Sequence, residues 1–447
     1  MRALALSLSL TACTPSLTEV RRPVDATIEQ RLGKQERVDP RALLAKPLDK
    51  NAAVAIALAN SPRLAAAFDS LGIAGGELGA ALGLGPLDIH GALRFGHDLE
   101  YEVDVVQDVL GVIASGKRRA AARADLEAVQ AEAAAQVLRL VARVEMAFAD
   151  LLAAQQELVL RREAFEAADA GAALRERMHA ADTTSTLAQA RERDAREQAR
   201  LDVGRAEADV EIKRERLNGL LGLSGRDTVW TATGALAELP ATAPALDGLE
   251  TASVAASLEL AAGRARTTAA ANRASDERLR TVLPILGIGA SVHDDGDGWA
   301  LGPVVRLGIP LFDQRAGQRM RATAEARRAG NELTASAVEL RASARAARIA
   351  ALAAYQEARH VRTVLLPLRQ QILDESVKHY NAMDTDPFAL VTARRDLVEG
   401  HARYLDALRR YWRAMAEVAA LQRGVSVTAG DLAEQGPRAV QRTQEDH

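Results

Sequence analysis

The residue types that catalyse reactions or bind metal ions are scattered in this sequence without the spacing that such chemistry needs. No glycine-rich phosphate loop follows a predicted strand, and the metal-binding pattern His-Glu-x-x-His does not occur. No histidine has a ligand-like spacing with another histidine or with the cysteine; the eight are His90, His97, His179, His293, His360, His379, His401 and His447. We therefore predict that the protein is not an enzyme and needs no metal and no cofactor.

The only cysteine, Cys13, has a sequence context that predicts lipidation. It follows a basic residue, an apolar run over residues 4–10 and two small residues, which is the order of a bacterial export signal. A cysteine directly after the cut is typical of a lipoprotein signal, so residues 1–12 are predicted to be removed and Cys13 to carry acyl chains. Thr14 in the next position, rather than aspartate, favours the outer membrane. The alternative is an ordinary signal peptide in which Cys13 occurs by chance.

Polar and sulfur-containing residues gather where two predicted long helices reverse direction. They are Met178, His179, Asp182, Thr183, His379, Met383, Asp384 and Asp386. Two methionines do not make a metal site, and solvated polar turns are the favoured interpretation of the histidines. The aspartates could form acidic rings that attract cations, or they could cap the returning helices. For Asp182, capping is favoured.

Cations follow the predicted strands, and aromatic residues flank them. The cations are Lys117, Arg118, Arg119, Arg315, Arg319 and Arg321. The aromatic residues are Phe95, Tyr101 and Trp299. Cations at a helix N-terminus oppose the helix dipole, which makes anionic lipid headgroups a candidate partner; the alternative is ordinary solvated charge. Aromatic residues at strand ends are typical of a membrane-interface belt.

The composition excludes several classes of protein. The chain has 447 residues and a net charge of -3, from 57 basic and 60 acidic residues, so no nucleic-acid partner is expected. Aromatic residues make up only 3%, which suits alanine-rich helices in close contact. After the N-terminus, no run of 18 apolar residues predicts a membrane-spanning helix. Any passage through a membrane would have to use β-strands.

The element that organises the chain is a long helix predicted over residues 117–181. It contains no proline and one glycine, and Val137, Val141, Val144 and Phe148 recur at steps of four and three. This period of 3.5 residues predicts a helix packed along most of its length, as in a coiled coil. At 1.5 Å per residue the helix is about 95 Å long, so an elongated fold is predicted.

A β-hairpin is predicted before this helix, within residues 86–110. Apolar residues at positions 101, 103 and 105 alternate with acidic ones, which gives one apolar and one polar face. A short helix over 62–81 leads into the hairpin, and a return helix over 185–221 follows the long one. The polar stretch 13–46 is predicted to be an extended arm, and 223–248 a connector.

The same order of elements then occurs a second time. Ser61, Leu64 and Ala65 match residues 257, 260 and 261 at a shift of 196, and Leu151 and Gln155 match residues 352 and 356 at a shift of 201. Repeat one covers 47–222 and repeat two covers 249–424. Repeat two has strands within 284–310, a long helix over 317–381 bent at Pro367, and a return helix over 387–422. The tail, 425–447, is predicted to be disordered.

Two hairpins give four strands per chain, which is too few to close a barrel. The smallest closed barrels have about eight strands. The strand count therefore predicts an oligomer, and three copies would supply twelve strands. The fold class predicted from the residues is mainly α with a small β part, built as a duplicated α–β–α repeat of long antiparallel helical hairpins.

With its signal-like N-terminus and duplicated α–β–α order, the chain resembles the TolC-type outer-membrane efflux family. The segments that carry the resemblance are Gly-Pro-Leu at 85–87, Leu-Pro-Ile at 283–285, Gly-Ile-Pro-Leu-Phe-Asp at 308–313 and the stretch 380–424. The resemblance implies a homotrimer with a twelve-stranded β-barrel in the outer membrane and an α-helical barrel in the periplasm. It also implies the outer-membrane channel of a tripartite efflux or type I secretion system, fed by an inner-membrane pump through a periplasmic adaptor.

The sequence departs from this family at the predicted helical turns. The glycine that is usual there matches Met383 in repeat two and Ala180 in repeat one. The acidic residues that close the entrance in the best-known member match Ala389 and Thr392. The gating residues of this chain therefore cannot be carried over from the family.

A second function is compatible with the long helices. It is a periplasmic coiled-coil lipoprotein that tethers or supports other structures and forms no pore. The strands favour the channel, because a tether has no use for two amphipathic hairpins at matching places in a duplicated chain. The residues do not identify the exported substrate.

Overall fold

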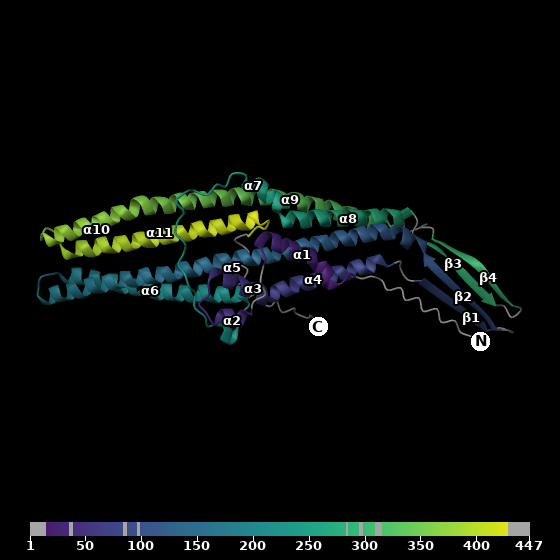
Figure 1. The fold of residues 1–447 in the computed structure, drawn as a ribbon, viewed down its shortest axis with the longest axis horizontal. Helices are drawn as coiled ribbons and strands as arrows, with labels where there is room; N and C mark the ends of the chain where they lie inside the picture. The colour runs from purple at the N-terminus through teal and green to yellow at the C-terminus, as the bar shows by residue number, and fades with distance from the viewer. Residues whose placement is uncertain are drawn as a thin grey trace. The chain divides into compact units, whose positions relative to one another are not determined.

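The computed structural model describes residues 15–34, 39–83, 87–95, 99–282, 285–294, 298–308 and 315–427. These residues form two compact units. Figure 1 labels their helices and strands. The first unit consists of Met1–Gly33, Arg63–Gln136 and Ser257–Glu339, and the second of Lys34–Pro62, Val137–Ala256 and Leu340–His447. Each unit therefore takes segments from both predicted repeats, and the two units are described separately below.

The first unit holds a four-stranded antiparallel sheet with strand order β1-β2-β3-β4. Its strands are β1 (Leu87–Phe95), β2 (Leu99–Asp108), β3 (Ile285–Asp294) and β4 (Trp299–Gly308). The hairpins of the two repeats join side by side where β2 pairs with β3. A Cβ atom at Gly289 would overlap the carbonyl oxygen of Val105, so glycine lets the two hairpins approach this closely.

The helices of the first unit are α1 (Leu17–Leu32), most of α4 (Pro62–Leu82), the first part of α5 (Val109–Ala180), α8 (Leu258–Val282) and the first part of α9 (Ala316–His360). Helix α4 contains several glycines, yet it stays helical to Leu82 because two of them lie against α1. A Cβ atom at Gly75 would lie 3.0 Å from Val20 Cγ2. The glycines therefore provide the close approach that buries α1 on α4.

Helix α1 corrects the prediction of an extended arm over residues 13–46. Its first turn is closed by a capping box, in which Ser16 Oγ accepts from Glu19 N and Ser16 N donates to Glu19 Oε2 at 2.8 Å. Val20 and Val24 are buried, and Gln130 of α5 donates from Nε2 to the Val20 carbonyl oxygen at 2.8 Å. The short α2 (Pro40–Leu44) also lies in this stretch. Only two residues of α1, Val20 and Val24, are buried. A helical period cannot be recognised from two apolar positions, so the sequence pattern did not reveal this helix.

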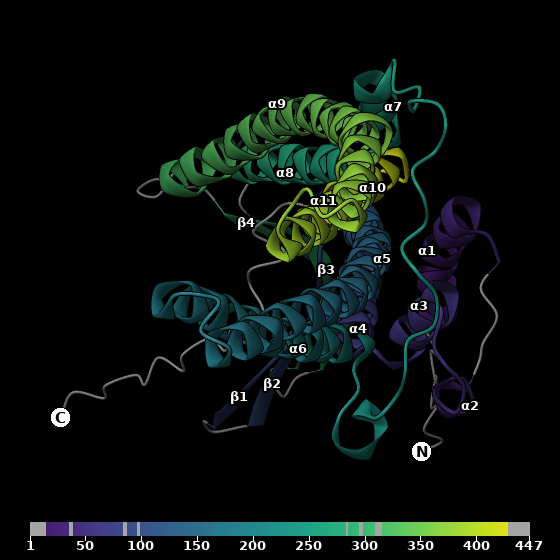
Figure 2. The ribbon, with the colours of Figure 1, turned by 90° about the vertical axis from the view of Figure 1, so that its left-hand side faces the viewer.

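The second unit contains α3 (Lys50–Asn60), the last part of α5, α6 (Thr186–Leu221), α7 (Leu249–Ala256), the last part of α9, α10 (Leu366–Asn381) and α11 (Pro387–Gln422). Its helices form two long hairpins, α5 with α6 and α10 with α11 (Figure 2). A π-helical turn over Val361–Leu365 separates α9 from α10. It lies just before Pro367, which lacks the N–H that would bond to the carbonyl four residues earlier. The predicted bend at Pro367 is thus preceded by a widened turn.

The connector predicted over 223–248 packs into the core of the second unit. Leu236 and Leu239 are buried against Tyr355 of α9 and Tyr411 of α11. Tyr355 is 1% exposed, and its hydroxyl donates to the Ala241 carbonyl oxygen at 3.0 Å. The indole Nε1 of Trp412 donates to the Ala237 carbonyl oxygen at 2.7 Å. Aromatic side chains, scarce elsewhere, are therefore concentrated where the connector crosses the helices.

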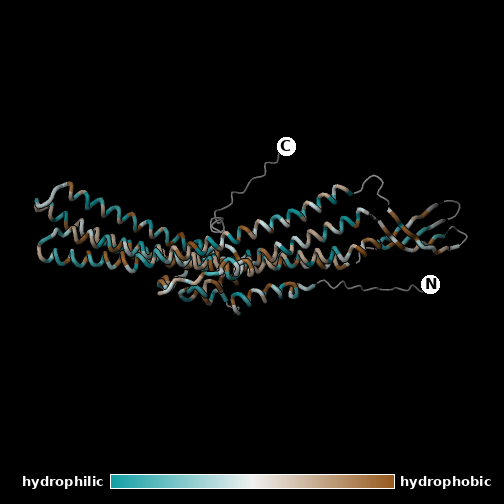
Figure 3. The backbone as a smooth tube through the Cα atoms, turned by 90° about the horizontal axis from the view of Figure 1, so that it is seen from above, coloured by the Kyte–Doolittle hydropathy of each residue, from teal (hydrophilic) through white to brown (hydrophobic). Residues whose placement is uncertain are grey.

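Hydrophobic and hydrophilic residues alternate along the helices of both units (Figure 3). This alternation gives helices such as α4, α5 and α11 a buried stripe, and alanine supplies much of it. Within the described part of the chain, no helix combines the length and the hydrophobicity that a membrane crossing would require. The predicted fold class is confirmed: long helices dominate, with a small antiparallel sheet contributed by both repeats.

Candidate functional site: the sheet faces and the helical turns

One face of the sheet is apolar and exposed. Strand register places alternate residues of all four strands on it, and the most exposed are Ile89, Leu93, Ile288, Trp299, Leu301, Val305 and Leu307, each more than half exposed. The predicted alternation in β2 contributes Tyr101 and Val103 to the same face. A continuous exposed apolar face of this kind requires an apolar partner.

The opposite face of the sheet is polar. It carries Asp88, His90, Glu102, Asp104, Ser291, His293 and Arg306. Arg306 Nη1 lies 3.2 Å from His90 Nε2, so contacts between side chains of β1 and β4 cross this face. The two faces of one sheet therefore have opposite polarity.

The three predicted belt residues lie near the hairpin ends of the strands. Phe95 is the last residue of β1, Trp299 is the first residue of β4, and Tyr101 pairs with Asp294, the residue opposite Trp299. Trp299 is 71% exposed. A membrane-interface belt remains a prediction for these positions.

The basic residues after the first hairpin do not mark a helix start. Helix α5 begins at Val109, eight residues before Lys117, because the Asp108 carboxylate accepts from the Gly111 N–H at 2.9 Å and caps the first turn. The prediction that Lys117, Arg118 and Arg119 oppose the helix dipole was therefore wrong. Arg119 instead donates to the Leu82 carbonyl oxygen at 3.1 Å, at the C-terminus of α4, where the dipole favours a cation.

After the second hairpin, two of the three predicted basic residues form ion pairs. Arg315 directly precedes α9 and forms an ion pair with Glu277 of α8 at 3.1 Å. Arg321 pairs with Glu325 one turn later. Arg319 lies in the first turn of α9 and is exposed. Lipid headgroup binding by these residues remains a prediction.

The two hairpin turns of the second unit have the same backbone geometry. In repeat one, Thr183 N donates to the Met178 carbonyl oxygen at 2.9 Å, and Asp182 has a φ of 54°. In repeat two, Asp384 N donates to the His379 carbonyl oxygen at 2.9 Å, and Met383 has a φ of 58°. Both α5 and α10 thus end in a Schellman-type turn with a left-handed residue.

The turn geometry shows that Ala180 was the wrong match for the glycine that is usual in the family at the turn of repeat one. The left-handed residue there is Asp182, whereas Ala180 is still within α5. Capping by Asp182 was also the wrong interpretation, because Ser185 caps α6 by accepting from Ala188 N at 3.2 Å. In repeat two, Asp386 does cap α11, accepting from Phe388 N at 3.0 Å.

The predicted histidines bond within their own turns. His379 Nδ1 lies 2.9 Å from Asp384 Oδ2, and His179 Nδ1 lies 3.2 Å from the Thr184 carbonyl oxygen. Over the residues that the structure describes, no three histidine, cysteine, aspartate or glutamate side chains are grouped to hold a metal ion. Met383 is 94% exposed at the end of its turn.

Two residues that the sequence did not reveal connect the turns to each other. The Arg175 guanidinium lies 3.2 Å from the centre of the Phe388 ring, and its Nη1 donates to Thr184 Oγ1 at 3.0 Å. Phe388 is buried although it lies only two residues after the capping residue Asp386. A large apolar residue in an otherwise polar turn is unusual, so Phe388 was the sequence signal that could have indicated the contact with Arg175.

Replacing Met383 by glycine is expected to stabilise the second turn. A left-handed conformation costs an L-residue about 1–2 kcal/mol, and glycine avoids that cost. Hydrogen exchange of the Asp384 amide should slow about fivefold for a gain of about 1 kcal/mol. Met383→Ala is the control, since alanine keeps the strain and removes the exposed side chain. Equal exchange rates in the two variants would contradict the assignment of strain.

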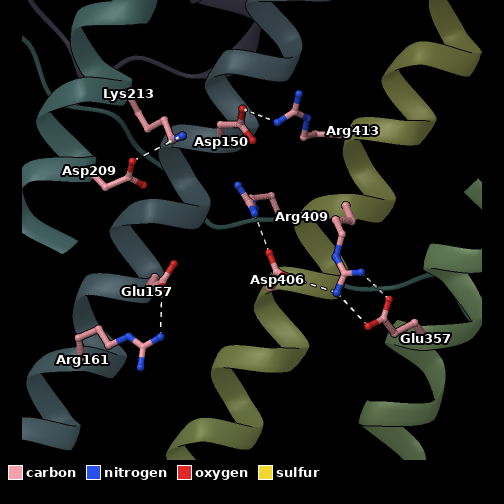
Figure 4. Close-up of polar contacts among 10 residues, drawn as sticks. Asp150, Glu157, Arg161, Asp209, Lys213, Glu357, Asp406, Arg409 and Arg413 are labelled. Carbon is pink, nitrogen blue, oxygen red and sulfur yellow. Dashed lines mark hydrogen bonds and ion pairs between the residues drawn. The ribbon is translucent and has the colours of Figure 1, made fainter. Parts of the chain in front are cut away.

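Ion pairs fix α11 between the two long helices within the second unit (Figure 4). Arg413 pairs with Asp150 of α5 at 3.4 Å, and Arg410 pairs with Glu357 of α9 at 2.8 Å. Arg423 adds a second pair to α5, with Glu145 at 3.0 Å. The more exposed pair of Arg410 with Glu357 contributes at most about 1 kcal/mol, so its main effect is to set which helix lies beside which.

Cys13 lies outside the described residues, so its lipidation remains a prediction. The predicted disordered tail also falls outside them, except for residues 425–427. Val425 and Val427 are buried.

Several solved membrane proteins have the same fold. The Campylobacter jejuni CmeC outer membrane channel has a TM-score of 0.72 at 14% identity, over 86% of this chain and 88% of that chain. The outer membrane protein VceC from Vibrio cholerae has a TM-score of 0.69 at 16% identity, over 84% of this chain and 96% of that one. A membrane protein from Pseudomonas aeruginosa has a TM-score of 0.69 at 18% identity, over 86% and 92%.

No family model and no curated protein matches the sequence. The likeness in structure is thus the finding that defines the fold. The chain has the fold of the TolC-type outer-membrane efflux proteins, as its duplicated α–β–α order predicted.

Proposed function

We propose that this chain is the outer-membrane channel of a tripartite efflux or type I secretion system. Three copies join their sheets into one twelve-stranded barrel in the outer membrane, and their helices continue as a tube in the periplasm. The sheet is the observation that carries this proposal. Its exposed apolar face suits lipid, and its polar face suits a water-filled interior.

In this proposal the channel is passive and has no catalytic role. The two hairpin turns form the periplasmic entrance and receive an adaptor, which connects the channel to an inner-membrane pump. Their exposed residues, which include Met383, Asp384 and Asp182, support this assignment. The chain is anchored to the outer membrane by a lipid on Cys13; palmitate labelling of the wild type, and not of Cys13→Ser, tests this part.

The competing function is a periplasmic tether without a pore. The apolar face of its sheet, with seven large exposed side chains, would then need an apolar partner other than lipid. Leaving this face in water is unfavourable. For this reason the channel is the better supported function.

Purified protein reconstituted in a planar bilayer distinguishes the two functions. The channel is expected to give discrete conductance steps, and light scattering in detergent is expected to give three copies per particle. A monomer without conductance would overturn the channel and leave the tether.

A further inference from the structure

A groove lies on the second unit at the point where the described chain ends. It has a volume of about 640 Å³ and is lined by residues of α9 and α11 and by the buried Met146 of α5. Ser426 and Val427, the last two described residues, also line it. The stretch that begins at residue 428 therefore starts at this groove.

The end of α11 turns the chain back toward the groove. Gly424 has a φ of 89° and donates from N to the Leu421 carbonyl oxygen, and Val425 N donates to the Ala420 carbonyl oxygen, both at 3.0 Å. These two bonds form a Schellman motif, which reverses the chain after a helix. Val425 and Val427 are buried, so the reversed chain is held on the second unit at its last described residues.

One wall of the groove is apolar and uncovered. Ala346, Ala350 and Ala353 of α9 line it, fall on one face of the helix and are exposed. Leu421 and the side chain of Met146 continue the apolar surface. The described part of the chain therefore leaves this wall accessible to a further segment.

The α11 side of the groove is basic. Arg409, Arg410 and Arg413 line it, against the two carboxylates of Glu357 and Glu417. All three arginines also form ion pairs with neighbouring carboxylates. A guanidinium has five N–H donors, so each arginine can bind a second carboxylate.

The sequence after Val427 has the chemistry that this groove needs. Residues 428–435 read Thr-Ala-Gly-Asp-Leu-Ala-Glu-Gln, with two carboxylates, one large apolar side chain and no cation. At about 3.3 Å per extended residue, Asp431 can lie up to about 13 Å from Val427, and Glu434 up to about 23 Å. At about 1.5 Å per helical residue, Arg413 and Arg409 lie about 12 and 18 Å along α11 from Leu421. Both carboxylates can therefore reach the arginines.

We propose that residues 428–435 dock in this groove, with Asp431 and Glu434 bound to the arginines of α11 and Leu432 packed on the alanines of α9. The segment is tethered at the groove by Val427, which gives it a higher effective concentration than a separate partner would have. Burial of Leu432 against the alanines adds an apolar contribution. The docking occurs within one chain, so it does not depend on the proposed channel.

Cysteine cross-linking in the full-length chain tests the docking. In Leu432→Cys with Ala350→Cys, mild oxidation with copper-phenanthroline is expected to link the two cysteines within one chain, as measured by mass spectrometry of the joined peptides. Leu432→Cys with Arg348→Cys is the matched control. Arg348 is exposed, lies two residues before Ala350 and thus about 200° around α9, so its link is expected to form about tenfold more slowly. Leu432→Cys alone detects any link to Cys13, the only native cysteine.

Three results would overturn the proposal. Equal rates in the two double variants would show that the segment has no fixed position, and a missing link to position 350 would show that it lies elsewhere. Links between separate chains would assign the groove to a second copy.

Neutralising the two carboxylates tests their contact with the arginines. Adding Asp431→Asn and Glu434→Gln is expected to slow the link between positions 432 and 350 about fivefold at low salt, because two exposed ion pairs are lost. The control adds Glu445→Gln and Asp446→Asn, which remove the same charge beyond residue 435, and is expected to leave the rate unchanged. Equal slowing in both would show that only the net charge matters, and would overturn the pairing with α11.

Discussion

An arginine at Leu301 is expected to abolish the oligomer in membranes while the helices stay folded. Leu301 lies in the apolar face of β4, opposite Val292, and its side chain is 65% exposed. In the proposed barrel this side chain faces lipid, where an arginine costs about 2–4 kcal/mol near the bilayer centre. Because every copy carries the change, the cost applies to each chain of the ring. Gel electrophoresis of unheated membranes measures the oligomer, and circular dichroism measures the helices.

Ala92→Arg is the matched control for this substitution. Ala92 lies in β1, is exposed, and pairs with Glu102 on the polar face of the same sheet. There the arginine meets a carboxylate and water, so a normal amount of oligomer is expected. If both arginines removed the oligomer equally, the assignment of the two faces would be wrong.

Truncating Tyr355 to alanine is expected to destabilise the second unit by about 3–5 kcal/mol, the usual cost of removing a large buried aromatic side chain. Tyr355 is 1% exposed, and its ring centre lies 5.9 Å from that of Tyr411. Its loss also leaves the connector without the hydrogen bond to Ala241. Thermal unfolding followed by the helical circular dichroism signal measures the effect.

Tyr355→Phe separates the ring from its hydroxyl. It keeps the packing and removes one hydrogen bond, so a loss of about 1 kcal/mol is expected. An alanine variant that unfolds at the same temperature as the phenylalanine variant would show that the ring contributes little.

Local patterns explain why the main architecture could be predicted from the sequence. The change from a 3.5-residue period to strict alternation at positions 101–105, and back again, marks helix, strand and helix without any knowledge of contacts. The duplicated match of Ser61, Leu64 and Ala65 then gives the second half. These patterns involve residues that are close in the sequence, so they can be recognised without knowledge of the tertiary contacts.

The elements that were missed depend on contacts between distant residues. Helix α1 is held by Val20 against Gly75. The start of α5 is the exception, because its cap from Asp108 to Gly111 is local. Helix α5 runs through Gly111 and Gly116, which lie before its predicted start at residue 117. The contact of Arg175 with Phe388 joins the turns of two different repeats, which no local pattern encodes.

The mixing of both repeats within each compact unit has a consequence for the order in which the chain can fold. The pair of Arg423 with Glu145 joins residues 278 positions apart, and α8 lies more than a hundred residues beyond the part of α5 that it covers. During translation, repeat one leaves the ribosome long before these partners exist. Its long helix must wait with an exposed alanine-rich surface until nearly the whole chain has been synthesised, which is the situation that makes slow-folding chains prone to aggregate. A chain truncated within repeat two therefore lacks the partners that both compact units need. Neither unit can fold completely, and the truncated chain becomes a substrate for chaperones and proteases.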